Sequence, residues 1–464
     1  SGIAAAETLR ALHSHGERGL RAAKALGIAG ALAALNNFWT DGLRLISPKL
    51  EPYSLGNWVT KLNEAIFHKV WMDRTVMFLW DPIFIAAGVI TGLRVGASMM
   101  LGGTLCWAVF VPYLQHRGIV TGSGYRELVQ WTLWGGTSCM VASGLVSFIM
   151  EWRSALRAFA SLGTMFSRRH RNRTDELDAI ETPGSWFAIG QLFSLVGLAY
   201  LGKVSFDMPY WESALAVLLS FGLALVACRV TGETDTTPIG AMGKVMQLTF
   251  GGLSPGNINI NLMSANIASG AAASSADLLT DLKSGYLLGA NPRKQFLAQF
   301  SGIFIGTIVT VLAFRIMVPN ASVLGSDEFP APAAQAWKAV AIALSKGLES
   351  LGPVKTWSIV IGGMVGLALP LLARFFPRRQ QYIPSAAGLG LAWTFHWYYS
   401  LLFFLGAVFG YVFERKAPAK SKEYTFPVAS GIIAGGSLMG VILIFWEHGL
   451  ALIKIGIRFL HSAF

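Results

Sequence analysis

The run FLAQFSGIFIGTIVTVLAFRIMV occupies residues 296–318 and contains one charged side chain, that of Arg315. A helix of about 20 apolar residues has the length needed to cross roughly 30 Å of hydrocarbon. Backbone groups inside lipid must bond to one another, and the chain shows no alternating barrel pattern, so the run predicts a transmembrane helix. Comparable runs predict spans at about 25–46, 76–93, 96–114, 128–150, 186–201, 211–230, 356–373, 396–413 and 427–446. We therefore predict an all-α, polytopic transmembrane helix bundle with about 10–12 membrane segments, some of them broken or re-entrant.

The composition agrees with a membrane protein and argues against a nucleic-acid-binding one. Of the 464 residues, 53% are hydrophobic and 13% are charged, whereas soluble domains carry about 25% charged residues. The net charge of +12 arises from basic residues in the loops between apolar runs. If the loop 151–184 is cytoplasmic, the loops on its side carry sixteen Lys and Arg residues and the opposite loops carry three, as the positive-inside rule requires. We therefore expect a multi-pass protein of the cell membrane that lies in a lipid bilayer and binds no nucleic acid.

The chain offers little sign of catalytic or metal chemistry. Cys106, Cys139 and Cys228 lie in apolar runs without the spacing of a disulfide framework or a metal site, so we interpret them as small core residues. Walker, HExxH, nucleophile-elbow and dinucleotide-binding patterns are not found. We expect no cofactor, no resident metal and no catalytic residue.

The expected organisation is a single transmembrane domain over residues 1–464. Its predicted parts are a lead-in with a weak first span and a polar loop (1–75), a group of spans (76–150), a basic cytoplasmic loop (151–184), and a C-terminal repeat half (185–464) that carries a polar motif at 229–299. The chain begins at Ser1 without a signal-peptide pattern, so we expect either a processed protein or a fragment.

Two stretches interrupt the pattern of apolar spans. Residues 231–256 are too polar and too rich in Gly and Pro for a lipid-facing helix, and residues 383–393 are too few to cross a bilayer. Irregular backbone at membrane depth is tolerated where it lines a cavity, and ionisable groups there are rare unless they face water or a partner. The polar segment 229–283, which begins with the first of these stretches, therefore supplies the candidate substrate and proton-coupling residues: Glu233, Asp235, Lys244, Gln247, Asn257, Asn261, Asn266, Asp277, Asp281 and Lys283.

Each candidate also has a structural interpretation. Glu233 and Asp235 could cap the helix that starts near residue 238, and Lys244 could extend toward the membrane interface. Asn257 could be an N-cap, and Asn266 could bond between helices. A further set, Asp277, Asp281 and Lys283, could form interfacial salt bridges because the two aspartates lie one helical turn apart.

Two motifs in this segment resemble the oligopeptide transporter (OPT) superfamily, which includes the yellow-stripe-like branch. They are R-x-T-G-E-T-D-x-x-P-I-G-x-x-G-K-x-x-Q-L at 229–248 and A-D-L-L-x-D-L-K-x-G-Y-L-L-G-x-x-P-R-x-Q-F-x-A-Q at 276–299. Flanking features, among them P-A-P-x-A-x-x-W at 330–337 and I-P-S-A-A-G-L-G at 383–390, extend the resemblance over about 80–441. The resemblance implies two related helical halves and proton-coupled symport of small peptides, peptide-like conjugates or metal chelates. It also implies longer chains with additional N-terminal spans, so this chain looks like a C-terminal portion that would need a missing N-terminal half or a homo-oligomer.

The leading hypothesis is thus a secondary-active, proton-coupled transporter of peptides or chelates, with protons as the coupling ion. One alternative is an intramembrane Mg²⁺-dependent enzyme resembling a prenyltransferase, because Asp277 and Asp281 form an Asp-xxx-Asp pair. That enzyme would need a second Asp cluster, and the pair Glu233 and Asp235 has the wrong spacing for it. A passive, channel-like membrane subunit is the other alternative.

Overall fold

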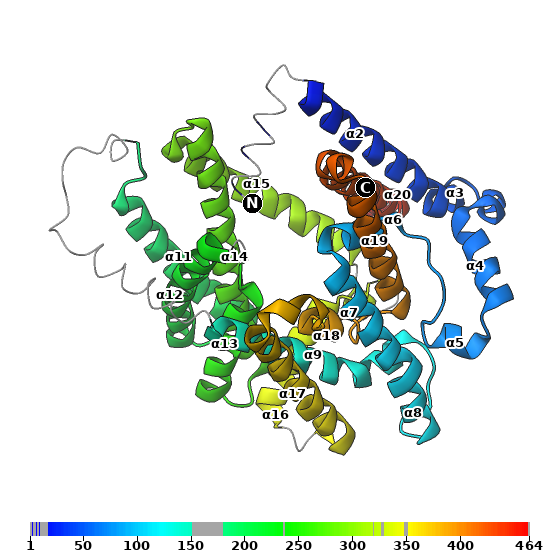
Figure 1. The fold of residues 1–464 in the computed structure, drawn as a ribbon. Helices are drawn as coiled ribbons and strands as arrows, with labels where there is room; N and C mark the ends of the chain where they lie inside the picture. The colour runs from blue at the N-terminus through cyan, green and yellow to red at the C-terminus, as the bar shows by residue number, and fades with distance from the viewer. Residues whose placement is uncertain are drawn as a thin grey trace. The chain divides into compact units, whose positions relative to one another are not determined.

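The computed structural model describes residues 2, 6, 9, 17–150, 180–234, 237–318, 320–325, 329–347 and 351–462, and it describes the side chains of these residues except at 17–19, 184, 233, 234, 316 and from 447 on. Within these residues every regular element is a helix (Figure 1). Eight of the helices are long and apolar enough to cross a membrane: Leu93–His116, Tyr125–Met150, Ser185–Phe206, Tyr210–Gly232, Pro292–Arg315, Pro353–Phe375, Trp397–Lys416 and Pro418–Trp446. The predicted all-α polytopic class is confirmed. The predicted weak span at 25–46 is also helical, but it is not among those eight.

The chain forms two compact units. The first comprises residues 1–10, 140–306 and 336–371, and the second comprises residues 11–139, 307–335 and 372–464. The expected single transmembrane domain and its subdivision stay predictions. Most of the predicted basic loop 151–184 lies outside the described residues.

The first unit contains α11 (Gly184–Phe206), α12 (Tyr210–Thr234), α13 (Ile239–Leu253), α14 (Ile258–Leu288), and most of α16 (Pro332–Lys346) and α17 (Pro353–Phe375). Two helices are shared between the units: α9 (Tyr125–Met150) belongs to the second unit up to residue 139, and α15 (Pro292–Met317) belongs to the first unit up to residue 306. In this unit α12 and α13 both pack along α14, and α11 packs on α12 (Figure 1). Local sequence sets the ends of α14. Asn257 caps its start by accepting a hydrogen bond from the Ile260 amide at 3.1 Å, and Gly289 ends it in the left-handed region (φ 75°).

The second unit combines three helices of 20 or more residues, α2, α19 and α20, with many short elements. They are α2 (Glu17–Asn37), η1 (Phe38–Gly42), α3 (Leu43–Ile46), η2 (Pro48–Tyr53), α4 (Leu55–Ile66), α5 (Lys69–Asp73), α6 (Pro82–Thr91), α7 (Leu93–Thr104), η3 (Leu105–Phe110), α8 (Val111–His116), η6 (Ala321–Val323), η8 (Pro377–Tyr382), α18 (Ala386–Leu391), α19 (Trp397–Lys416) and α20 (Pro418–Ser462). Its main pairings are α2 with α20, α6 and α7 with α19, and α18 with α7.

Glycine allows the closest of these helix pairs to form. A methyl group at Gly431 or Gly435 of α20 would overlap backbone atoms of α2, and one at Gly88 or Gly406 would overlap backbone atoms of the facing helix in the pair of α6 and α19. Helices in membranes associate through close backbone contact and van der Waals packing, which small residues permit. Asn37 adds a hydrogen bond from its amide to the Gly436 carbonyl oxygen at 2.8 Å.

The predicted short element at 383–393 is present as α18, which spans six residues and leads into an irregular segment before α19. Side chains satisfy the backbone of this segment. Tyr125 and Thr132 of α9 donate to the carbonyl oxygens of Thr394 and Trp393, each at 2.8 Å. The Trp107 indole donates to two further carbonyl oxygens there, at 3.1 and 3.3 Å. The freed carbonyls of a broken helix thus find donors inside the protein, as a low-dielectric setting requires.

One predicted loop contains a helix. Residues 319–352 lie between the predicted spans 296–318 and 356–373 and are therefore expected to be a loop, but α16 forms within them. Its 15 residues are too few for a span, so a search for long apolar runs passes over it. Its buried face consists of small residues, Ala336, Ala339 and Ala341. These residues favour helix and allow close packing.

Candidate functional site

The candidate site lies where α13 packs against α14. At 15 residues, α13 is about 22 Å long, less than the roughly 30 Å needed to cross hydrocarbon. A tight turn follows it, in which Gly256 has φ +88°, and α14 then runs back along it. The polar segment therefore folds as a helical hairpin whose first arm is unusually short.

Three of the predicted residues meet inside this hairpin. Lys244 and Gln247 lie one turn apart on α13, and the Lys244 ammonium donates to Gln247 Oε1 at 2.8 Å. Gln247 Nε2 donates to Asn261 Oδ1 of α14 at 3.0 Å, and Asn261 Nδ2 donates to the Gln247 backbone oxygen at 2.7 Å. The exposed fractions are 7% for Lys244, 0% for Gln247 and 1% for Asn261. The network is thus buried and directional, which fixes the position of the ammonium group.

Trp337 of α16 covers this network, and the sequence interpretation did not select it. The Lys244 ammonium lies 4.0 Å from the centre of the indole ring, a cation–π contact. Gln247 Nε2 also donates to the Trp337 carbonyl oxygen at 3.2 Å. The ring lies against Gly243, where a methyl group would overlap it. The sequence did hold a signal, because Trp337 ends the quoted P-A-P-x-A-x-x-W pattern, but no pattern indicated that it faces Lys244.

The charge of Lys244 has no acidic partner among the residues that the structure describes. The ion pairs of Arg21 with Glu423 and of Lys203 with Asp207 lie elsewhere and do not involve Lys244. An ammonium group away from water is costly unless an anion or strong acceptors compensate it. Here one amide oxygen and one aromatic face provide the visible compensation. This arrangement can bind a carboxylate or another anionic oxygen that reaches Lys244.

The other predicted residues lie elsewhere on the hairpin. Asn257 is exposed and serves as the N-cap, while Asn266, Asp277, Asp281 and Lys283 are exposed positions along α14. Glu233 belongs to the last turn of α12, but its side chain lies outside the description, as does Asp235 altogether. The structure therefore brings together Lys244, Gln247 and Asn261 of the predicted set. Substrate contact by any of the ten residues stays a prediction.

A cavity of about 810 Å³ lies in the same unit, between the starts of α11 and α15 and the end of α14. Its lining is largely apolar and aromatic, with Trp186, Tyr286 and Phe296 among its members. Arg293 fixes one edge by donating from Nε to the Glu181 carbonyl oxygen at 3.1 Å. Pockets of this size and character suit drug-sized organic ligands.

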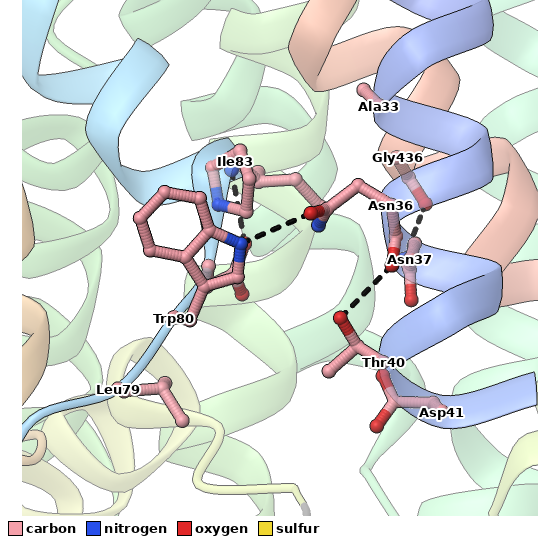
Figure 2. A pocket seen from close by; sticks show the side chains of 11 residues that line it. Ala33, Asn36, Asn37, Thr40, Asp41, Leu79, Trp80, Ile83 and Gly436 are labelled. Carbon is pink, nitrogen blue, oxygen red and sulfur yellow. Dashed lines mark hydrogen bonds between the residues drawn. The ribbon is translucent and has the colours of Figure 1, made fainter. Parts of the chain in front are cut away.

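The second unit has a smaller polar cavity of about 150 Å³ between η1 and the start of α6 (Figure 2). Figure 2 shows the Trp80 indole directed at Asn36, whose Oδ1 accepts its hydrogen bond at 3.0 Å. Two carboxylates, Asp41 and Asp81, also line it. Burial raises the pKa of Asp81, and the negative charge of Asp41 adds to the increase. No group of three or more His, Cys, Asp and Glu side chains suited to a metal occurs in the described part of the chain.

A protein-family model and several curated proteins match most of the chain. The family model described as "OPT oligopeptide transporter protein" matches residues 1–447. The Saccharomyces cerevisiae protein named "Putative oligopeptide transporter YGL114W" is 26% identical over 429 residues, which cover 79% of this chain and 58% of the yeast protein. The rice protein named "Probable metal-nicotianamine transporter YSL10" is 23% identical over 396 residues, which cover 78% of this chain and 57% of that protein. The chain thus spans little more than half the length of these curated relatives.

Proposed function

Because this chain belongs to the OPT oligopeptide transporter family, we propose that it takes part in secondary-active, proton-coupled import of small peptides or amino-carboxylate metal chelates across the cell membrane. The names of the relatives support both substrate classes, since one refers to oligopeptides and others to metal–nicotianamine. Both classes carry carboxylates. A metal in such a chelate is cargo of the transporter.

The observation that carries the proposal is the buried ammonium of Lys244. Its hydrogen bond to Gln247 and its contact with the Trp337 ring fix it in place, while no carboxylate among the described residues neutralises it. A fixed, desolvated cation binds an incoming carboxylate more strongly than a hydrated surface lysine does. We propose that the substrate carboxylate pairs with Lys244 once Trp337 has moved aside.

The amides of Gln247 and Asn261 would then bind other polar groups of the substrate. In the described arrangement each bonds to the other and to backbone, so the network is complete without a ligand. A substrate that displaces the bond between Gln247 and Asn261 must supply a donor or acceptor to each amide, so that neither side chain stays buried and unsatisfied. The same side chains can thus serve the closed state and a substrate-bound state.

The test is uptake by proteoliposomes that contain the purified full chain. Two probes are compared, a radiolabelled tetrapeptide and radioiron-labelled ferric nicotianamine, each with and without an inward proton gradient. We expect accumulation of at least one probe to depend on the gradient and to be lost in Lys244→Met. Equal uptake with and without the gradient would contradict proton coupling, and the failure of both probes to enter faster than into empty liposomes would contradict transport by this chain.

A further inference from the structure

A second buried charge lies in the first unit, and the sequence interpretation did not select it. Glu212, in the first turn of α12, is 4% exposed. Glu212 differs in this from the other acidic residues whose side chains are described in that unit, which are all exposed: Glu181, Asp207, Asp277 and Asp281. A carboxylate withdrawn from water is costly unless it is protonated or paired.

The contacts of Glu212 leave room for a proton. Its Oε1 accepts a hydrogen bond from the Ser254 hydroxyl, at the end of α13. Its Oε2 is buried without a hydrogen-bond partner, as is the hydroxyl of the next residue, Ser213. The ion pairs of Arg21 with Glu423 and of Lys203 with Asp207 do not include Glu212. A proton on Oε2 would neutralise the Glu212 carboxylate. It would also supply a hydrogen-bond donor in a region where Glu212 Oε2 and Ser213 Oγ have no partner.

The charged groups on the surrounding helices do not neutralise Glu212. On α11 the nearest charged residues along the chain, Lys203 and Asp207, are exposed and paired with each other. On α13 the one charged residue is Lys244, ten positions before Ser254 and therefore about 15 Å away along the helix. On α14 the first charged residue is Asp277, about 28 Å from the helix start.

Glu212 and the candidate substrate site are joined by one rigid element. Lys244, Gln247 and Ser254 follow one another along a single face of α13, at spacings of three and seven residues. The apolar side chains of Met246 and Phe250 lie in a buried cluster with Ala216 of α12 and Ala265 of α14. Whatever alters the bond between Glu212 and Ser254 acts on the helix that carries Lys244.

We propose that Glu212 is the residue that binds the coupling proton, and that Ser254 transmits its protonation state through α13 to the Lys244 site. This inference rests on the proposed transport function and names a residue for its coupling step. One proton binds Glu212 Oε2 on the side of high proton concentration and leaves from the same atom on the other side. Neutralising Glu212 also removes its repulsion of a substrate carboxylate at Lys244. At a separation of about 15 Å and an effective dielectric constant of about 20, this strengthens carboxylate binding roughly sixfold.

The test compares the wild-type chain with Glu212→Gln and with Asp207→Asn as a matched control. Glutamine preserves the shape of Glu212 and can still accept from Ser254, and Asn tolerates the left-handed backbone of Asp207 (φ 53°). Two measurements are made on each protein in liposomes. One is the infrared band of a neutral carboxylic acid in pH-difference spectra, which needs no substrate. The other is transport of a labelled tetrapeptide and of ferric nicotianamine, both as gradient-driven accumulation and as exchange at equilibrium.

We expect the wild type and Asp207→Asn to show a buried carboxylic-acid band and gradient-driven accumulation. Glu212→Gln should lose both while it still exchanges probe at equilibrium. An unchanged infrared band in Glu212→Gln would overturn the assignment, as would accumulation at the wild-type level. Loss of exchange in a variant that elutes like the wild type would also overturn it, because Glu212 would then support more than coupling. If no protein transports either probe, the proposed function fails, and the infrared band still decides whether Glu212 binds the proton.

Discussion

Replacing Lys244 by methionine tests whether its ammonium binds the substrate carboxylate. Methionine has a similar length and an apolar end, so it can fill the space beneath the Trp337 ring. The matched control is Lys338→Met, because Lys338 neighbours Trp337 in the chain but is exposed. Any general effect of losing a positive charge should appear in both variants.

The expected magnitude follows from the contacts that are exchanged. A hydrogen bond between charged groups contributes about 1.5–3 kcal/mol, and each 1.4 kcal/mol is about tenfold in affinity. Loss of the Lys244 ammonium should therefore weaken binding of a carboxylate-bearing substrate by about 10- to 150-fold. The fold should tolerate the change, because removal of a buried charge offsets the lost bond to Gln247 and the lost ring contact.

The assay is equilibrium binding of two tetrapeptides that differ only at the C-terminus, one a free acid and the other an amide. The wild type and Lys338→Met should prefer the acid, and Lys244→Met should bind the two peptides alike. Such a cycle isolates the pairing of one protein group with one substrate group. If Lys244→Met weakens binding of both peptides by the same factor, Lys244 supports the fold of the site and does not contact the carboxylate.

Three further predictions concern the second unit. Gly435→Ala should destabilise the protein by about 1–3 kcal/mol, because the methyl group overlaps the backbone of α2; thermal unfolding in detergent measures this, and Gly27→Ala, where the methyl meets nothing, is the control. Tyr125→Phe should cost about 1–3 kcal/mol in the same assay, because the Thr394 carbonyl oxygen loses its donor, and an unchanged melting temperature would show that another donor replaces it. The fold raises the pKa of Asp81, so the stability that the protonated Asp81 side chain contributes should fall as pH rises from the ordinary aspartate pKa through the raised one. Asp81→Asn should lose this pH dependence of the melting temperature, and parallel curves of melting temperature against pH for the two proteins would contradict the argument.

The sequence predicted the helical class and most long helices because their signal is local. A run such as 296–318 can hardly be anything except a helix in lipid, and α15 occupies it. The sequence did not predict α16, because the helix is short and its buried residues are alanines. Hydropathy along the chain does not separate such a helix from a loop. Contacts between side chains on different helices likewise cannot be predicted from a single apolar run. The meeting of Lys244 with Gln247 follows from their spacing of three, whereas its contact with Trp337 depends on how α16 packs.

The burial of Glu212 also could not be predicted from the local sequence. It stands at the start of an apolar span, where an acidic residue suggests a favourable helix N-terminus at the interface. Its burial depends on α13, whose end brings Ser254 to it across 42 positions of sequence. The asparagines of α14 were selected together for their polarity, yet Asn261 faces the hairpin interior and Asn266 does not. Their positions on the helix surface, and the helix that covers each face, decide that difference.

The contact between α2 and α20 has a consequence for how the protein is made. Asn37 and Gly436 are 399 positions apart, and at about 5–20 residues per second the ribosome needs roughly 20–80 s to reach the second after the first. During that time the face of α2 that contains Ala29 and Gly30 cannot pack against α20. Substitutions on this face should therefore reduce the yield of inserted protein during synthesis even where the completed fold accommodates them.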